Sequence, residues 1–130
     1  APVACTKILM DASDLQFEDQ SFDNITSFFT MMYIPKDIHK KVVNEAYRVL
    51  KPGGKLYLWD ADIPENSQDY QVFIIQLNIA LQKETITTGY GVGYKQQNLN
   101  YYIELLMEAG FTIESNQTSD QTYTITAVKG

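Results

Sequence analysis

The stretch from residue 43 to residue 60, VNEAYRVLKPGGKLYLWD, constrains the fold more than any other part of the sequence. Apolar residues from about Lys36 to Leu50 recur at the spacing of one helix face, which predicts an amphipathic helix. Pro52 cannot continue that helix, and the two glycines that follow it can take the positive φ values that reverse a chain. Residues 55–59 then have the apolar character of a short buried strand. The stretch therefore predicts a helix that stops sharply and returns the chain to a sheet.

A second apolar segment precedes this helix at Phe22 to Phe29 and is rich in the β-branched and aromatic residues that favour strands. A strand, a helix and a strand form a βαβ unit, whose strands are parallel and whose crossover is almost always right-handed. Asp60 and Asp62 follow the second strand at its carboxyl end, where ligands of open α/β sheets bind. The sequence therefore predicts an α/β fold with a site at this edge of the sheet.

The rest of the chain contains further strand and helix patterns. The segment from Val72 to Tyr94 predicts a hairpin with one buried face, and a short helix over residues 69–80 is the alternative. A helix is predicted from Leu99 to Met107, and Gly110 is well placed to end it. Other strands are predicted at Thr6 to Met10, Phe111 to Glu114 and Thr122 to Val128, the last two joined by a turn at Asn116 to Asp120.

Composition bounds the class of protein. The chain has 130 residues, of which 45% are hydrophobic and 20% charged, as expected of one globular domain. Its 16 acidic residues outnumber its 10 basic ones, so it lacks the basic surface that nucleic acid requires. Cys5 is the only cysteine, which excludes an internal disulfide and a multi-thiolate metal site. No apolar run approaches the roughly 20 residues that span a bilayer, so we expect a cytoplasmic protein with no membrane, nucleic-acid or metal partner.

Four short motifs follow one another along the chain: Asp11-Ala12-Ser13-Asp14-Leu15, Asp19-Gln20-Ser21-Phe22-Asp23, Arg48-Val49-Leu50-Lys51-Pro52-Gly53-Gly54 and Glu108-Ala109-Gly110-Phe111. Together they resemble the class I S-adenosylmethionine-dependent methyltransferases (type 11). The resemblance is nearest to the branch that includes the ubiquinone and menaquinone biosynthesis methyltransferases. Order and spacing agree from about Lys7 to Gly54, and beyond that the similarity is one of architecture.

The resemblance implies an open, Rossmann-like α/β sheet with the strand order 3-2-1-4-5-7-6, in which strand 7 is antiparallel. Residues 6–10 would be strand 3, residues 22–29 strand 4 and residues 55–59 strand 5, and the last two segments would be strands 6 and 7. Strands 1 and 2, with the glycine-rich loop and the acidic residue that hold the cofactor, have no counterpart in these residues. We therefore expect residues 1–130 to form the truncated, carboxyl-terminal part of a single methyltransferase domain, with a substrate-side insertion at about residues 65–95.

The resemblance also implies which residues bind the cofactor, S-adenosyl-L-methionine. Asp11 would accept a hydrogen bond from the adenine amine, and Ala12 and Leu15 would pack on the ring. Ser27 and Phe28 would face the methionine part. The structural alternatives are a turn-capping role for Asp11 and ordinary core positions for Ser27 and Phe28.

Catalytic residues are harder to name. Many relatives carry two histidines where this chain has Met32-Tyr33, which leaves no evident general base there. Methyl transfer from a sulfonium to a nucleophilic atom needs mainly alignment and desolvation. Tyr33 and Asp60 are the candidates for orienting an acceptor, although Asp60 is expected in a loop, where a carboxylate usually faces water. His39, the only histidine, falls among lysines on the polar side of the predicted helix, where we expect a solvated surface role.

The predicted activity is methyl transfer from S-adenosylmethionine to a small apolar or aromatic acceptor by the full-length protein. The 130 residues alone are expected to have an incomplete cofactor site and no activity. One alternative is a non-catalytic methyltransferase-like module that acts by self-association or partner binding, and another is a nucleotide-dependent oxidoreductase built on Gly89 to Gly93. Without strands 1 and 2, the strand at residues 22–29 has an exposed apolar edge. We therefore expect either self-association there, with residues 6–10 as one segment that fills the gap, or that these residues are only the ordered part of a longer chain.

Overall fold

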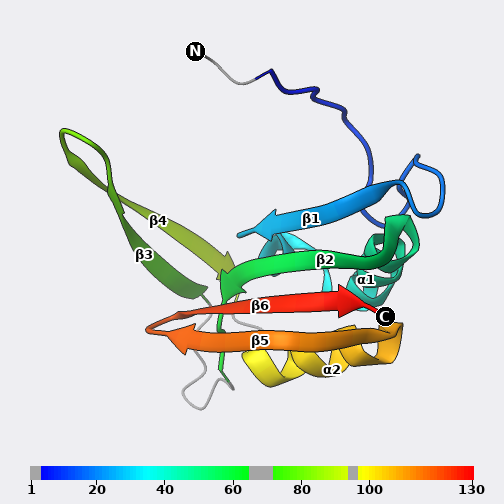
Figure 1. Ribbon diagram of the computed structural model, residues 1–130. Coiled ribbons are helices and arrows are strands. Elements are labelled where there is room, and N and C mark those ends of the chain that lie inside the picture. The colour runs from blue at the N-terminus through cyan, green and yellow to red at the C-terminus, as the bar shows by residue number, and fades with distance from the viewer. Residues whose placement is uncertain (1–3, 65–71, 94–96) are drawn as a thin grey trace.

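The computed structural model describes residues 4–64, 72–93 and 97–130. It contains a four-stranded sheet, a separate two-stranded hairpin and two α-helices (Figure 1). The elements in chain order are β1 (Phe22–Phe28), the 3-10 turn η1 (Met31–Tyr33), α1 (Lys36–Val49), β2 (Leu50–Ala61), β3 (Val72–Ala80), β4 (Thr85–Gly93), α2 (Leu99–Ala109), β5 (Phe111–Ser119) and β6 (Thr122–Lys129).

The four-stranded sheet has the order β1-β2-β6-β5. Strand β1 runs parallel to β2, whereas β6 is antiparallel to both β2 and β5. These strands correspond to strands 4, 5, 7 and 6 of the implied order, and the antiparallel strand is the one expected. The predicted fold class is therefore confirmed, including a sheet without counterparts of strands 1 and 2 in the described residues.

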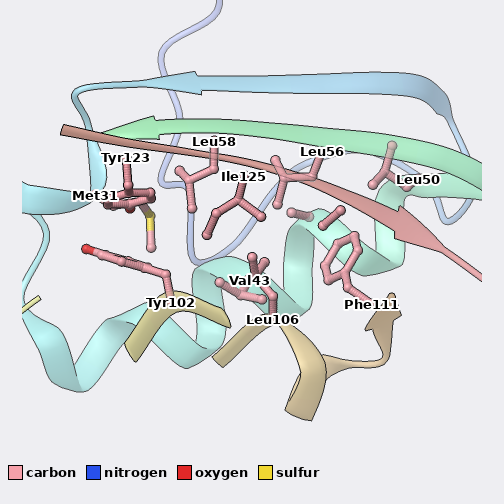
Figure 2. Packing of buried hydrophobic residues seen from close by; sticks show 12 residues of the cluster. Met31, Val43, Leu50, Leu56, Leu58, Tyr102, Leu106, Phe111, Tyr123 and Ile125 are labelled. Atoms are coloured by element: carbon pink, nitrogen blue, oxygen red, sulfur yellow. The ribbon is translucent and has the colours of Figure 1, made fainter. Parts of the chain in front are cut away.

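Both helices lie against the same face of the sheet (Figure 1). Figure 2 shows side chains of the strands meeting side chains of α1 and α2 in one layer. The fully enclosed members include Leu50, Tyr102, Leu106, Tyr123 and Ala127. This layer is the main hydrophobic core, and it fixes the helices relative to the strands.

The opposite face of the sheet carries exposed aromatic side chains. Phe28 is 52% exposed, Tyr57 40% and Trp59 42%, because they alternate along β1 and β2 with residues that point to the helices. Within the described ranges, no helix covers this face (Figure 1). A parallel strand pair is normally covered on both faces, so half of the packing expected around β1 and β2 is missing from these residues.

Helix α1 passes into β2 without a loop. The N–H of Leu50 still donates to the Ala46 carbonyl, and Leu50 already has extended angles. Gly53 has a φ of 81°, and a Cβ on Gly54 would lie 2.9 Å from the Asp23 carbonyl oxygen of β1. The strand predicted at residues 55–59 is therefore longer than expected, because the two glycines let the chain continue alongside β1 instead of making a free turn.

The strand predicted at Thr6 to Met10 is wrong. Residues 4–10 have no regular secondary structure, and Leu9 is fully exposed. A strand is stable only when its N–H and C=O groups find a neighbour, and β1 pairs with β2 alone among the described strands. The segment therefore does not fill the gap beside β1.

The predicted hairpin is confirmed over residues 72–93, where β3 and β4 pair antiparallel in continuous register. The alternative helix is wrong for residues 72–80, and residues 69–71 and Tyr94 lie outside the described ranges. The run Gly89 to Gly93 lies within β4, so it is not a loop between a parallel strand and a helix, and the dinucleotide interpretation is wrong. The predicted turn at Asn116 to Asp120 is also mostly strand, because β5 extends to Ser119.

Candidate functional site

A tight turn follows β1 at the carboxyl end of the parallel strands. Phe29 has a φ of 49°, a left-handed value that bulky side chains rarely adopt. Its N–H donates to the Trp59 carbonyl of β2 at 2.8 Å. The N–H groups of Thr30 and Met31 donate to one carboxylate oxygen of Asp60, at 3.1 and 2.8 Å. The turn is therefore bound to the end of β2 by three hydrogen bonds.

Asp60 is part of β2 and fully buried, so the expectation of a loop carboxylate facing water is wrong. Its other carboxylate oxygen accepts from the Ala61 N–H at 2.8 Å. Burial raises the pKa of Asp60, and the backbone hydrogen bonds oppose this rise only in part. Both oxygens of this candidate for orienting an acceptor are thus occupied by the protein's own backbone.

His39 is also fully buried, so the solvated surface role expected for it is wrong. One ring nitrogen, Nε2, lies 2.9 Å from the Met31 carbonyl, and Nδ1 lies 2.8 Å from the Tyr101 hydroxyl. A carbonyl can only accept, so Nε2 carries the proton and Nδ1 accepts from Tyr101. Burial lowers the pKa of His39, which favours this neutral ring.

Tyr33, the other candidate for orienting an acceptor, ends the 3-10 turn η1 and is 51% exposed. Asp62, by contrast, accepts from the Leu99 N–H at 2.8 Å and so satisfies the first turn of α2. Of these two polar side chains, Tyr33 is the one accessible to a molecule at the carboxyl edge.

A cavity of about 260 Å³ lies between β1, α1 and the segment that precedes β1. Four of the five residues predicted to bind the cofactor line it, namely Ala12, Leu15, Ser27 and Phe28. The other lining residues are mostly apolar: Ile25, Thr26, Thr30, Met31, Ile34, Val42, Val43, Ala46, Leu56 and Leu58. The cavity therefore suits a flat apolar or aromatic group better than a charged one.

Asp11, the fifth predicted residue, does not line the cavity. Its carboxylate accepts from the N–H and the hydroxyl of Ser13, at 2.8 and 2.7 Å. These hydrogen bonds lower the pKa of Asp11, the side-chain bond most strongly. This contact is of the kind that the turn-capping alternative describes. Because the pKa is lowered, the carboxylate remains ionised, and it lies next to Ala12, which lines the cavity.

Two residues of α1 hold the segment that contributes Leu15, and the sequence alone gave no sign of it. Arg48 donates to the carbonyls of Leu15 and Phe17 and to the carboxylate of Asp19, all at 2.8 Å. Glu45 accepts from the Leu15 N–H at 2.9 Å and from Arg48 at 2.7 Å. The spacing of Glu45 and Arg48 predicts a pair on one helix face, but not a partner some 30 residues earlier in the chain.

Two kinds of site find no support in the described part of the chain. No three His, Cys, Asp or Glu side chains there come close enough to hold a metal ion. Among the helices of that part, none has both the length and the apolar character needed to cross a membrane.

A mixed sheet with this strand order, and with a cavity beside the carboxyl end of its first parallel strand, defines a Rossmann-like methyltransferase fold. A putative S-adenosylmethionine-dependent methyltransferase of Listeria monocytogenes superposes with a TM-score of 0.64 at 16% identity, over 100% of this chain and 71% of that one. At this identity the likeness concerns the fold alone.

Sequence comparison relates the first part of the chain to one family. Residues 2–58 match the family model described as a methyltransferase domain. The demethylmenaquinone methyltransferase of Listeria welshimeri is 41% identical over 63 residues, which are 48% of this chain and 26% of that protein. The sterol 4-C-methyltransferase strm-1 of Caenorhabditis elegans is 39% identical over 56 residues, 43% of this chain and 16% of that protein.

These matches confirm the predicted resemblance to the class I S-adenosylmethionine-dependent methyltransferases: residues 2–58 match a methyltransferase family in sequence, and the described residues share the fold. The matched segment contains both the Asp11 to Leu15 motif and the Arg48 to Gly54 motif. The alignments span about a quarter or less of the length of these curated relatives.

Proposed function

We propose that this chain supplies one side of the S-adenosylmethionine site of an enzyme that methylates a small molecule. The observation that carries the proposal is that Ala12, Leu15, Ser27 and Phe28, from two separate segments, line one cavity. In this arrangement Ala12 and Leu15 pack on the adenine ring, with the ionised Asp11 next to them to accept from its amine. Ser27 and Phe28 lie toward the methionine part.

The cofactor supplies the chemistry, since its sulfonium gives up a methyl group to a nucleophilic atom of the acceptor and becomes a thioether. The residues of this chain bind, align and exclude water, and these contributions are sufficient for a nucleophile that needs no activation. Tyr33, half-exposed at the carboxyl edge, orients the acceptor through its hydroxyl. The hairpin β3–β4 projects beyond the same edge (Figure 1) and covers an apolar acceptor.

The site within these residues is incomplete. Pockets that enclose a drug-sized ligand measure about 300–1,000 Å³, so a cavity of about 260 Å³ accommodates only part of a cofactor of that size. Among the described strands β1 has one pairing partner, and the face beside it is uncovered, so further strands and helices of a complete site could pack there. We therefore propose that the chain is competent only together with that part, and inactive alone.

A titration of the isotope-labelled chain with S-adenosylmethionine, followed by amide NMR shifts, tests the proposal. We expect weak, millimolar binding with the largest shifts at residues 12, 15, 27 and 28. Phe28→Ala should reduce these shifts, whereas Tyr57→Ala, which removes an exposed aromatic ring that does not line the cavity, should not. Shifts centred elsewhere would refute the site, and micromolar binding would refute its incompleteness.

A second candidate function, a non-catalytic module that acts by self-association, has one supporting observation. Among the described strands β1 has one partner, so one of its edges is open, and open apolar edges recruit further strands. Asn24→Lys, which adds a charge on β1, should then reduce association measured by light scattering. Thr112→Lys, on the opposite edge strand β5, is the matched control and should not. A wild-type chain that stays monomeric at high concentration would exclude this candidate.

A further inference from the structure

The turn after β1 has a strained backbone. It joins the end of β1 that lines the cavity to a second buried cluster. Phe28 is directed outward and lines the cavity with Ser27. Phe29, the next residue, is directed inward and packs in a second buried cluster with Met32, Ala61, Ile63 and Ile75, the last from the hairpin. Consecutive strand residues already point to opposite faces, so the left-handed φ of Phe29 marks instead the point where the chain leaves β1 and turns toward Met31.

A strained backbone of this kind persists only where its surroundings determine it. Asp60 holds the turn from the sheet side by accepting from Thr30 and Met31, while its other oxygen is fixed by Ala61. His39 holds it from the helix side by donating to the Met31 carbonyl at 2.9 Å. The two polar side chains, both fully buried, thus meet at the backbone of Met31 from opposite directions.

We infer that Asp60 and His39 are positioning residues of the proposed site: they hold the strained turn at Phe29 and so fix the end of β1, where Ser27 and Phe28 line the cavity. Neither side chain is exposed, so neither touches a ligand, and both act through the backbone of the turn. The identification of the cavity as a cofactor site rests on the proposed function, whereas the restraint on the turn does not depend on that function. It replaces the candidate role of Asp60 in orienting an acceptor.

Trp59 is the only tryptophan and reports on the turn directly. Its ring centroid lies 4.7 Å from that of Phe28 and 6.0 Å from that of Phe29. In Asp60→Asn the amide has one acceptor oxygen where the carboxylate has two, so either the Ala61 N–H or both the Thr30 and Met31 N–H groups lose their acceptor. We expect a shifted Trp59 emission in a chain that remains folded by circular dichroism.

The matched control is Asp62→Asn, two residues later in the chain. The amide oxygen of the variant can still accept from the Leu99 N–H. Among the residues that the structure describes, the Asp62 side chain makes no hydrogen bond to the turn. We expect its Trp59 emission to equal that of the wild type. The shifts induced by S-adenosylmethionine at residues 27 and 28 should fall several-fold in Asp60→Asn and stay unchanged in Asp62→Asn. Equal emission and equal shifts in the two variants would overturn the inference.

His39 supplies a second test by rescue. His39→Leu removes the donor to Met31, whereas the amide of His39→Gln can restore it, so the first should shift the Trp59 emission and the second should bring it back toward the wild-type value. If His39→Leu and His39→Gln had the same Trp59 emission, a positioning role for His39 would be contradicted.

Amide hydrogen exchange of the wild-type chain tests the restraint without any variant that could fail to fold. The N–H groups of Thr30 and Met31 should be protected as well as those in the centre of β2, because Asp60 accepts both. Exchange at the rate of an open loop would overturn the inference. If S-adenosylmethionine induces no shifts in the wild type while these amides are protected, the cofactor site fails and the restrained turn stands.

Discussion

Lys129 is predicted to be one of the largest single contributors to stability outside the hydrophobic core. It lies near the end of β6 and is 9% exposed, which is unusual for a lysine. Its ammonium donates to the carbonyls of Tyr47 and Leu50, both at 2.8 Å, and lies 4.7 Å from the centre of the Tyr47 ring. These carbonyls belong to the end of α1, where the helix passes into β2 without a glycine cap. Lys129→Met removes the ammonium and keeps a stem of similar length.

The magnitude follows from these contacts. Two hydrogen bonds from a charged donor contribute about 1.5 kcal/mol each at the low end of the usual range, or about 3 kcal/mol together. Burial of the ammonium costs part of this gain, and the methionine recovers that part. The remaining loss is about 2 kcal/mol, which lowers the melting temperature of a domain of this size by roughly 6 to 8 °C.

The assay is equilibrium unfolding in urea, followed by circular dichroism and by Trp59 fluorescence. Lys55→Met is the matched control, because Lys55 lies on β2 and pairs with Glu114 at 2.9 Å where both side chains are well exposed. Exposed ion pairs contribute little, so Lys55→Met should leave the unfolding free energy unchanged within error. If the two variants lost equal amounts, the ammonium of Lys129 would not stabilise the end of α1, and the reasoning would be refuted.

Two further predictions concern stability. Gly54→Ala should lower the free energy of unfolding by about 2 to 3 kcal/mol, because the new Cβ would lie within 3 Å of two backbone oxygens. Gly53→Ala has open space around its Cβ and should lower it by only about 1 kcal/mol, because of the positive φ. Urea unfolding of both variants checks this order. Stability should fall as the pH drops from 7.5 to 5.5, because the unfolded chain protonates its histidine near pH 6.5 while burial keeps the pKa of folded His39 lower. His39→Gln should remove most of this slope, since no other histidine exists, and an unchanged slope would contradict it.

Much of the fold was predictable because its elements are defined locally. The amphipathic period of α1, Gly110 at the end of α2 and the alternation in β6 each depend on neighbouring residues only, and each agrees with the structure. The order of the four strands came from a resemblance to a family and not from these local patterns. It needed a motif that joins β1, α1 and β2 into one unit.

The errors have a common physical cause, which is that they depend on partners far away in sequence. The sequence places His39 among surface lysines, whereas in the structure its buried ring nitrogens are satisfied by the Met31 carbonyl and the Tyr101 hydroxyl. Thr6 to Met10 has the composition of a strand, but composition supplies no neighbour for its backbone. The sequence suggests that Asp60 is a loop carboxylate, because the N–H group of the turn that donates to it lies 30 residues earlier in the chain.

The most recognisable motif of the chain, Arg48 to Gly54, contributes no residue to the cavity lining. Its residues act on the site from outside: Arg48 fixes the segment that presents Leu15, and Gly54 allows Asp23 of β1 to approach β2 closely. A variant of this motif should therefore disturb cofactor contacts through the position of Leu15 or of β1, and not through a lost contact of its own. Because Arg48 and Asp60 act on different segments, Arg48→Gln should affect the amide shifts at residues 12 and 15, and Asp60→Asn those at residues 27 and 28. A variant of either residue that abolished all four shifts equally, in a folded chain, would show that the two sides of the cavity are not positioned independently.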